Sequence, residues 1–432
     1  MMMRRKHLRT GSAILVALLA WVATSHAASL TRTESRIAAS AKDGLPRAIE
    51  LLAETVNVQS ATENKDGVRK AGAIYARELA ALGFETRWIE LPPELDRGGH
   101  LIAERHGSRG KRVLLIGHVD TVLQGEPFRR EGSRAYGTGS SDMKGGNLVI
   151  VEALRALHAA KQLDNTTITV MLTGDEEDPG SPTSVTRQPL VDAAARSDVA
   201  LAFEGASPEL GVVGRRGVGT WHLTVTGKQA HSSGIFQESV GYGAIFEAAR
   251  ILERFRVDLP EPYLTYNPSI IVGGTDVTYD AAGKSGTALG KTNVIPRQVQ
   301  VEGDIRYLTR EQFEKASARM KQIVAEGNLA VTSAEITLQF EYPAMAPTDA
   351  NRELLTMLDR ASRDLGGGAV HAQDPSERGA GDISFICEGK IACLDGLGAV
   401  GDHEHAPGES IDLDMLPMQI QRAALLIYRL TR

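Results

Sequence analysis

Residues 168–177 have the sequence ITVMLTGDEE, in which an apolar, β-branched segment leads through Gly174 into three acidic residues. This pattern predicts a buried strand whose carboxyl end opens onto a cleft. The adjacent carboxylates of Glu176 and Glu177 repel one another, so a buried strand end tolerates them only where a cation lies beside them. The stretch therefore predicts a cation-binding site at the end of a strand.

Histidine and acidic residues end or follow other apolar segments in the same way. They are His118 and Asp120 after residues 113–116, Asp142 at the end of the loop 139–142, Glu204 after residues 199–203, and His405 in the segment 403–409. Imidazole and carboxylate side chains gathered at strand ends are typical of a metal site. Their number favours a site for two ions.

Strand-like and helix-like segments alternate from about residue 30 to residue 211. The predicted helices span 34–58, 65–82 and 145–161, and the predicted strands span 85–91, 113–117, 167–172 and 199–203. The alternation predicts an α/β fold with a mostly parallel, doubly wound sheet and helices on both faces. Ligands bind beyond the carboxyl ends of the strands in such sheets, which is where the acids and histidines occur.

The order of segments changes after residue 213. From 219 to 342 the pattern is β-α-β-β-α-β, the order of a split βαβ, ferredoxin-like α+β domain, with a glycine-rich excursion at 276–291. Because 351–395 resumes the earlier alternation, this domain is inserted. We therefore predict a metal-binding catalytic domain made of residues 28–212 and 346–432, interrupted by an inserted domain at 213–345.

The first 27 residues have the composition of a signal peptide. Four basic residues precede the apolar segment 12–23, and Ser25-His26-Ala27 is a small-x-small cleavage site. The apolar segment is short for a bilayer span, although a retained signal anchor is the alternative. We therefore expect an exported protein, periplasmic or secreted, with no membrane contact after cleavage.

The composition limits the partners of the protein. Removal of residues 1–27 takes away four positive charges and lowers the formal net charge from −6 to −10. An acidic protein without a basic run is not expected to bind nucleic acid. Cys387 and Cys393 fall in a helix-like and a strand-like segment, so we predict two free, buried thiols rather than a disulfide.

The chemistry of the strand-end side chains suits zinc. Zn²⁺ binds neutral imidazole and carboxylate, and two ions a few ångströms apart need one carboxylate to bridge them. The predicted ligands are His118 and His405 through nitrogen, and Asp142, Glu177 and Glu204 through oxygen. Asp120 is placed to bind the other ring nitrogen of His118. Glu176 is then left over and is the candidate general base.

The same residues lie in motifs that resemble those of the dizinc exopeptidase family, which includes glutamate carboxypeptidases, aminoacylases, acetylornithine deacetylases and succinyl-diaminopimelate desuccinylases. The motifs are His118-Val119-Asp120, Asp142-Met143-Lys144-Gly145-Gly146, Gly174-Asp175-Glu176-Glu177, Glu204 and His405-x-x-x-Glu409. The resemblance covers essentially the whole mature chain. It implies two Zn²⁺ ions bridged by Asp142, with cobalt or manganese as substitutes. It places His118 and Glu204 on one ion and Glu177 and His405 on the other, with Glu176 as the base.

The inserted domain resembles the lid and dimerisation domain of that family. His231 resembles the lid histidine, which would stabilise the oxyanion of a tetrahedral intermediate. Asn293 and Arg306 resemble residues that bind the substrate carboxylate, and Arg216 is a second candidate for this role. The segment 276–291 is longer than in relatives and could reshape the edge of the pocket. Because the lids of many relatives dimerise, the resemblance implies that a homodimer can form here.

The resemblance also implies an activity, hydrolysis of an amide bond next to a free carboxylate. The closest likeness is to exported glutamate carboxypeptidases, which would release a C-terminal amino acid from a small peptide or an N-acyl conjugate. An N-acyl-amino-acid deacylase or dipeptidase remains an alternative, and a non-catalytic binding protein is a third. Retention of Glu176 argues against the binding protein, because a binder has no need of the base. Residues 379–382 read GAGD where many relatives have GGSD, so the substrate contact of that serine is in doubt.

Overall fold

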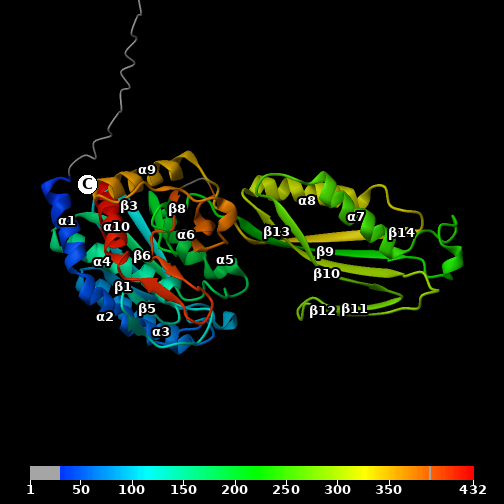
Figure 1. Cartoon of the computed structure of the whole chain (residues 1–432), viewed down its shortest axis with the longest axis horizontal. Coiled ribbons are helices and arrows are strands. Elements are labelled where there is room, and N and C mark those ends of the chain that lie inside the picture. The colour runs from blue at the N-terminus through cyan, green and yellow to red at the C-terminus, as the bar shows by residue number, and fades with distance from the viewer. Residues whose placement is uncertain (1–29, 389–390) are drawn as a thin grey trace, which may run out of the picture.

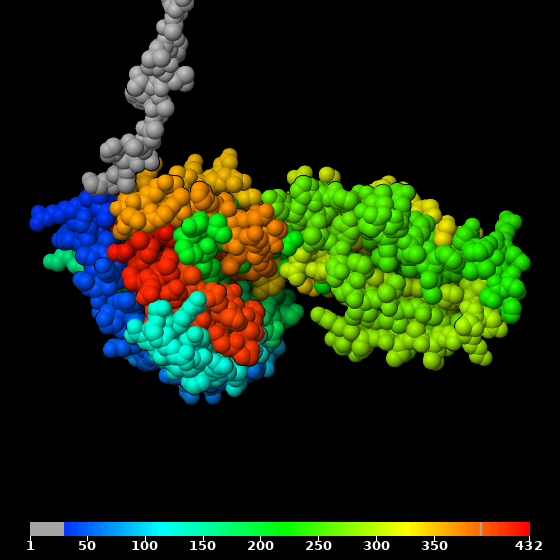
Figure 2. All heavy atoms as spheres, in the orientation of Figure 1, coloured from blue at the N-terminus to red at the C-terminus, as the bar shows by residue number. Residues whose placement is uncertain are grey.

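The computed structural model describes residues 30–388 and 391–432, so the predicted signal peptide lies outside the described residues. The chain forms a larger and a smaller part that meet over a narrow neck (Figure 1; Figure 2). The larger part contains the beginning and the end of the described chain, and the smaller part is formed by the middle of the sequence. Within the described residues, no helix combines the length and the apolar character that a bilayer span requires.

A six-stranded sheet forms the centre of the larger part. Its spatial order is β1 (Glu85–Ile89), β2 (His100–Arg105), β6 (Thr166–Thr173), β3 (Arg109–His118), β7 (Val199–Ala202) and β16 (Ala392–Leu394). The strands from β6 to β16 run parallel, and β2 pairs antiparallel with both β6 and β1. The mostly parallel sheet predicted from the sequence is confirmed. Strand β2 was not predicted from the pattern.

Helices cover both faces of this sheet, as a doubly wound fold requires. Leu115 of β3 packs in an apolar cluster with residues of α1, α4 and α10, whereas Leu114 and Ile116 pack in another cluster with residues of α6. Successive side chains of a strand point to opposite faces, so a strand buried throughout contacts both layers. The helices are α1 (Arg32–Asp43), α2 (Leu45–Val56), α3 (Lys65–Ala81), α4 (Gly146–Ala159), α5 (Thr183–Thr186), α6 (Gln188–Ala195), α9 (Asp349–Asp364) and α10 (Leu416–Thr431).

The helix predicted at 34–58 is two helices, α1 and α2, which are separated at Gly44. Thr31 and Glu34 form a capping box at the start of α1. Pro46 lies in the first turn of α2 and lacks the backbone N–H that would continue α1, so a new helix begins there. The prediction of one continuous helix was therefore wrong at Gly44.

The smaller part has its own sheet and its own core. The sheet order is β10 (Thr265–Gly274), β13 (Gln298–Tyr307), β9 (Gly217–Gly227) and β14 (Thr332–Tyr342), and all pairs are antiparallel. Helices α7 (Ala244–Asp258) and α8 (Arg310–Ala325) cover one face (Figure 1). Trp221 of β9 meets Phe255 of α7 edge to face in this core, with ring centroids 5.9 Å apart. The element order matches the predicted α+β domain.

The glycine-rich excursion at 276–291 forms a hairpin of β11 (Asp276–Asp280) and β12 (Ser285–Leu289). Tyr279 of this hairpin stacks on His222 of β9, with ring centroids 5.4 Å apart, on the face that α7 and α8 leave open (Figure 1). The hairpin therefore borders the open face of the smaller sheet. No residue of it lines the pocket beside the predicted metal ligands.

A small four-stranded sheet positions two loops beside the central sheet. Its order is β17 (Gly401–Asp402), β18 (Ser410–Asp412), β5 (Arg134–Tyr136) and β4 (Arg129–Glu131). The loop between β17 and β18 contains His405, and the chain after β5 leads into a distorted helical turn at Ser140–Gly145 that contains Asp142. Pairing of β18 with β5 brings these two loops together. A further short parallel pair joins β8 (Leu210–Gly211) to β15 (His371–Ala372).

Cys387 and Cys393 form a disulfide, so the prediction of two free thiols was wrong. Cys387 ends the short helical segment Asp382–Ile386, and Cys393 lies in β16. Their Cα atoms lie 6.2 Å apart, within the span of a disulfide. Hydrophobic periodicity predicts the element in which each cysteine lies but not the distance between the two cysteines.

The disulfide is expected to stabilise the larger part. A ring of this size removes conformational entropy from the unfolded chain worth about 2 kcal/mol. We expect a Cys387→Ser, Cys393→Ser double variant to have a free energy of unfolding lower by about this amount, measured by urea denaturation. The wild type in reducing agent is the control and should approach the variant. Equal stability of all three samples would contradict this role.

Candidate metal centre

Histidines and acids from separate segments converge beyond the carboxyl ends of β3, β6 and β7. Two groups of side chains place their potential ligand atoms within 4.8 Å of one another: His118, Asp142 and Glu204, and Asp142, Glu177 and His405. Together these are the five ligands predicted from the sequence. Asp142 belongs to both groups, whereas the nearby His403 belongs to neither.

Asp142 lies between the two histidines. Its Oδ1 is 3.0 Å from Nε2 of His118, and its Oδ2 is 2.9 Å from Nε2 of His405. Each histidine has a second carboxylate beside it: Glu204 Oε1 is 4.0 Å from Nε2 of His118, and Glu177 Oε2 is 3.2 Å from Nε2 of His405. A carboxylate with one oxygen directed to each of two ligand sets is the arrangement of a bridging ligand.

Glu409 fixes the loop that presents Asp142. Its buried carboxylate accepts hydrogen bonds from the backbone N–H groups of Gly139 at 2.6 Å, Ser141 at 2.8 Å and Asp142 at 2.9 Å. A loop whose amides all bind one carboxylate has little freedom to move. The fixed spacing between His405 and Glu409 in the sequence motif therefore has a structural reason.

Asp120 connects His118 to the paired glutamates. Nδ1 of His118 lies 3.1 Å from the carbonyl oxygen and 3.3 Å from Oδ1 of Asp120. The two carboxylate oxygens also accept the backbone N–H groups of Glu176 and Glu177, each at 3.1 Å, and the Thr62 hydroxyl at 2.7 Å. Burial acts to raise the pKa of Asp120, but these hydrogen bonds hold that pKa below its usual value. Asp120 therefore stays ionised and orients both neighbours.

Asp120→Asn is expected to weaken metal binding about 10–100-fold, the usual effect of losing a partner that orients a ligand. An amide has only one acceptor oxygen, so its NH₂ group would face a backbone N–H of Glu176 or Glu177. The measurement is zinc affinity by competition with a chelator, together with kcat/KM. Asp276→Asn, at a side chain 72% exposed on the hairpin, is the matched control. An unchanged zinc affinity in Asp120→Asn would contradict the orienting role of Asp120.

The charges of the site fit divalent cations. Burial and the neighbouring carboxylate of Asp142 raise the pKa of Glu204 to about 8, and burial together with nearby acids raises the pKa of Glu176 well above its usual value. Hydrogen bonds to Asp142 and Glu177 raise the pKa of His405 to about 11. Oε1 of Glu177 is buried and has no hydrogen-bond partner among the described residues. Divalent cations would satisfy this oxygen, offset the negative charge and displace the protons.

Glu176 lies beside the metal-ligating residues but belongs to neither group among the described residues. Its backbone is held on both sides, because its N–H donates to Asp120 and its carbonyl oxygen accepts the Tyr342 hydroxyl at 3.4 Å. The backbone of the candidate base is therefore fixed by contacts from the central sheet and from the last residue of β14.

A buried ion-pair network supports the end of β6, and sequence reasoning missed it. Arg187, 1% exposed, donates to Asp175 Oδ1 and to Asp382 Oδ1, both at 2.6 Å. Asp382 also accepts the Thr173 hydroxyl at 2.6 Å. Asp175 was visible within the acidic motif, but Arg187 lies in a segment without any motif. Its pairing with a residue 195 positions away leaves no signal in local sequence.

The residues of the inserted domain that were predicted to contact substrate do not line the pocket beside the metal ligands. His231 is exposed and its Nδ1 is 2.8 Å from the Ser233 hydroxyl oxygen. Its segment pairs with that of Asn293, since Ser232 N–H donates to the Asn293 carbonyl oxygen at 3.0 Å. Arg306 binds Asp304 of its own strand at 3.0 Å. The structure therefore brings His231 and Asn293 near one another, but neither these residues nor Arg306 line the pocket beside the metal ligands.

The sequence analysis named Arg216 as a candidate for binding the substrate carboxylate, but its neighbour Arg215 is the one that is buried near the metal-ligating residues. Arg216 donates to the Thr265 hydroxyl and to the Ser376 carbonyl oxygen at the surface. Arg215 is buried, forms an ion pair with Asp395 and contributes its charge to Glu204. Successive residues of an extended chain face opposite sides, so a pattern without three-dimensional context does not tell which of the two faces the site.

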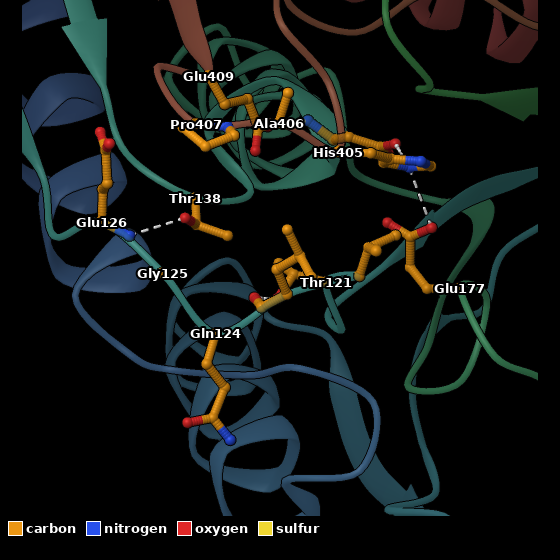
Figure 3. A pocket seen from close by; sticks show the side chains of 13 residues that line it. Thr121, Gln124, Gly125, Glu126, Thr138, Glu177, His405, Ala406, Pro407 and Glu409 are labelled. Atoms are coloured by element: carbon orange, nitrogen blue, oxygen red, sulfur yellow. Dashed lines mark hydrogen bonds and ion pairs between the residues drawn. The ribbon is translucent and has the colours of Figure 1, made fainter.

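A pocket of about 120 Å³ opens beside Asp142, Glu177 and His405 (Figure 3). We call it the Leu123 pocket, after one of its wall residues. Figure 3 shows His405 and Glu177 on one side and, on another, the backbone of Glu126 bonded to Thr138. Loop 121–126 and the loop of His405 form its walls.

Comparisons with known proteins agree with this geometry. The family model of peptidase family M20/M25/M40 matches residues 114–429. Carboxypeptidase G2 of Pseudomonas sp. (strain RS-16) is 27% identical over 422 residues, which cover 96% of each chain. The crystal structure of aminopeptidase PepT from Bacillus cereus ATCC 10987 superposes with a TM-score of 0.72 at 19% identity, covering 90% of this chain and 99% of that one. A dinuclear metal-binding M20 peptidase of Bacillus subtilis superposes with a TM-score of 0.63 at 17% identity, covering 90% and 99%.

The two superpositions concern the fold, and the family follows from the sequence match. That match begins in β3 and ends in α10, so it includes every residue of both metal groups. The family model therefore covers the part of this chain that contains both groups of candidate metal ligands, and the family includes a peptidase that binds two metal ions. Because the model matches more than half of the 432 residues, the chain belongs to peptidase family M20/M25/M40 and is a hydrolase of that family.

Proposed function

We propose that this hydrolase uses two zinc ions to cleave an amide bond next to a free carboxylate, releasing a C-terminal amino acid of the glutamate type from peptides or N-acyl conjugates. The observation that supports it most is the Asp142 carboxylate, which directs one oxygen to each of two histidines. Imidazole and carboxylate oxygen are the ligands that zinc accepts in catalytic sites. The likeness to carboxypeptidase G2 over 96% of both chains supports the reaction class.

The chain supplies a base, an orienting group and a site for the ions. When bound, two zinc ions polarise a carbonyl oxygen and lower the pKa of water. Glu176 accepts a proton from the attacking water at its carboxylate and passes that proton to the leaving amide nitrogen. Asp120 holds the tautomer of His118 and, through two backbone N–H groups, the position of Glu176. His231 donates to the developing oxyanion once the inserted domain, or that of a second subunit, approaches.

The substrate carboxylate requires cations or other hydrogen-bond donors from outside the metal groups. Arg306 and Asn293 in the inserted domain fill this role in the proposal, with Arg216 at the neck between the parts. Closure of the inserted domain over the site would bring these residues to the substrate. A second subunit is an equivalent source of His231. Ile245 and Phe246 of α7, each 49% exposed, offer an apolar surface for such a homodimer. Analytical ultracentrifugation of the mature protein tests it.

Export to the periplasm or the medium is part of the proposal. The basic and apolar leader supports it, and so does the disulfide, because disulfides persist in oxidising compartments and are rare in the cytoplasm. Fractionation of expressing cells, with a variant lacking residues 1–27 as control, tests it. Full-length protein retained in the cytoplasm with reduced thiols would contradict export.

The experiment for the activity is amine release from a panel of N-acyl amino acids and dipeptides by the purified mature protein. The protein is reconstituted with zinc, cobalt or manganese. Release only from compounds with a free C-terminal carboxylate, fastest with glutamate, supports the proposal. Preference set by the acyl group rather than the C-terminal residue favours the deacylase alternative. Absence of release in a protein that binds two ions would contradict a hydrolase for these substrates.

A further inference from the structure

The two sides of the metal-ligating residues differ in polarity. On the side of Glu177 and His405 lies the Leu123 pocket, whose walls include Val122, Leu123, Ala406 and Pro407. Val122 and Leu123 are 37% and 47% exposed, which is unusual for apolar side chains beside a site crowded with acids. No lysine or arginine lines this pocket. Apart from the metal-ligating residues themselves, it therefore offers apolar contact and no counter-charge for an anion.

Several polar groups around the Leu123 pocket have partners within the chain. Gln59 binds the N–H and the carbonyl oxygen of Gly125 at 2.8 and 3.3 Å, and the Thr121 hydroxyl donates to the Leu123 carbonyl oxygen at 2.9 Å. The two carboxylate oxygens of Glu409 accept three backbone N–H groups. The loop is thus fixed, and what it presents to the pocket is chiefly hydrocarbon. A preformed apolar pocket beside a reactive centre is a side-chain subsite.

On the side of Glu204, a second pocket of about 260 Å³ begins at Gly205 and is lined by Ser207, Gln373 and Arg378 together with the acids Asp402 and Glu404. Nε of Arg378 is buried without a hydrogen-bond partner among the described residues. Asp402 in the same pocket is engaged by Arg134 at 2.6 Å, so it competes little for Arg378. A substrate carboxylate would find a charge-assisted hydrogen bond on this side and none on the other.

We propose that the Leu123 pocket holds the acyl half of the substrate, and that this acyl group is uncharged, apolar and about the size of a leucine side chain. The half with the free carboxylate lies on the side of Arg378, which adds a contact to those proposed for Arg306 and Asn293 of the inserted domain. The inference rests on the proposed amide hydrolysis and adds the acyl specificity to it. Pockets that enclose a whole drug-sized ligand are about 300–1,000 Å³, so about 120 Å³ fits a single side chain. A dicarboxylic acyl group such as succinyl would bury an unpaired charge there.

The test uses a series of N-acyl derivatives of one amino acid, with acetyl, butanoyl, pentanoyl and succinyl groups. We measure kcat/KM with the zinc-loaded mature protein, and Kd by calorimetry with zinc-loaded Glu176→Gln. Each buried CH₂ group is expected to raise kcat/KM and affinity about fourfold until the pocket is full. Succinyl should fall at least about tenfold below pentanoyl, its uncharged analogue of similar length.

Three variants test which pocket holds the acyl group. Leu123→Arg should lower kcat/KM for pentanoyl and raise it for succinyl, so that their ratio shifts at least about tenfold. Leu289→Arg, at a leucine 70% exposed on the hairpin, should leave the ratio unchanged. Arg378→Gln should raise KM for all acyl groups without changing their ratio. A change of the succinyl preference in Arg378→Gln instead would place the acyl half on the opposite side and overturn the proposal.

Failure of this inference and failure of the proposed function look different. Hydrolysis of the whole series without dependence on chain length or charge would overturn the pocket assignment and leave the hydrolase intact. Chain-length-dependent binding without any hydrolysis would retain the pocket and contradict the proposed reaction. Neither binding nor hydrolysis of any member would overturn both.

Discussion

Glu176→Gln is expected to lower kcat by about 10²–10⁴-fold while the protein still binds two metal ions. Glutamine keeps the size of the side chain but cannot accept a proton from water at neutral pH. Glu176 belongs to neither metal group, so the ligand set is unchanged. The KM should change little, because the loss concerns proton transfer in the transition state rather than binding of the substrate.

The neighbouring residue provides the matched control. Glu177→Gln makes the same chemical change one position further on, but Glu177 belongs to the group with Asp142 and His405. We expect this variant to lose affinity for one ion, measured by metal content after dialysis, as well as activity. Loss of metal in Glu176→Gln, or kcat within about threefold of the wild type, would contradict the role of Glu176 as general base.

Asp142→Asn is expected to weaken binding of both metal ions by more than about 100-fold, which exceeds the effect of removing an orienting partner such as Asp120. The two oxygens of Asp142 face different histidines, and an amide replaces one of them with an NH₂ group that cannot bind a cation. Activity should fall with metal content.

Metal-dependent stability gives a second measurement for Asp142→Asn. A ligand at 1,000 times its Kd stabilises the folded state by about 4 kcal/mol. Zinc should therefore raise the Tm of the wild type strongly and that of the variant little. Asp198→Asn, at a surface aspartate paired with Arg112, is the control and should respond like the wild type. Two equivalents bound with unchanged affinity would show that Asp142 does not bridge the ions.

Most of the central architecture follows from local patterns. The strands at 113–117, 167–172 and 199–203 correspond to β3, β6 and β7, because buried parallel strands are continuous apolar runs bounded by turns. Strand β2 is partly polar and short, and the break at Gly44 interrupts an otherwise amphipathic run. Both were missed because the sequence pattern of a few residues is weaker than the hydrophobic pattern of the surrounding segment.

The candidate metal ligands could also be found without coordinates. Parallel strands have their carboxyl ends at one edge, so a residue just after one strand meets residues just after its neighbours. His118, Glu177 and Glu204 follow β3, β6 and β7 in this way. Asp142 and His405 lie on loops instead, and for them the resemblance to family motifs supplied what strand order did not.

Other features depend on contacts between distant residues. Arg187 pairs with Asp382 across 195 positions, and Arg215 rather than Arg216 turns inward beside Glu204. The disulfide depends on the distance between two cysteines, which hydrophobic periodicity does not record. None of these pairings changes the local composition from which a sequence pattern is read.

The amino-acid sequence by itself determined the α/β class, the inserted α+β domain and the residue types that end the strands, since these depend on neighbours along the chain and on the direction of parallel strands. Tertiary structure alone decided that a buried arginine supports the acidic strand end and that no lysine or arginine lines the Leu123 pocket. The position, polarity and volume of a site depend on several segments that meet only when the chain folds. The proposed metal bridging and acyl selectivity depend on these three properties.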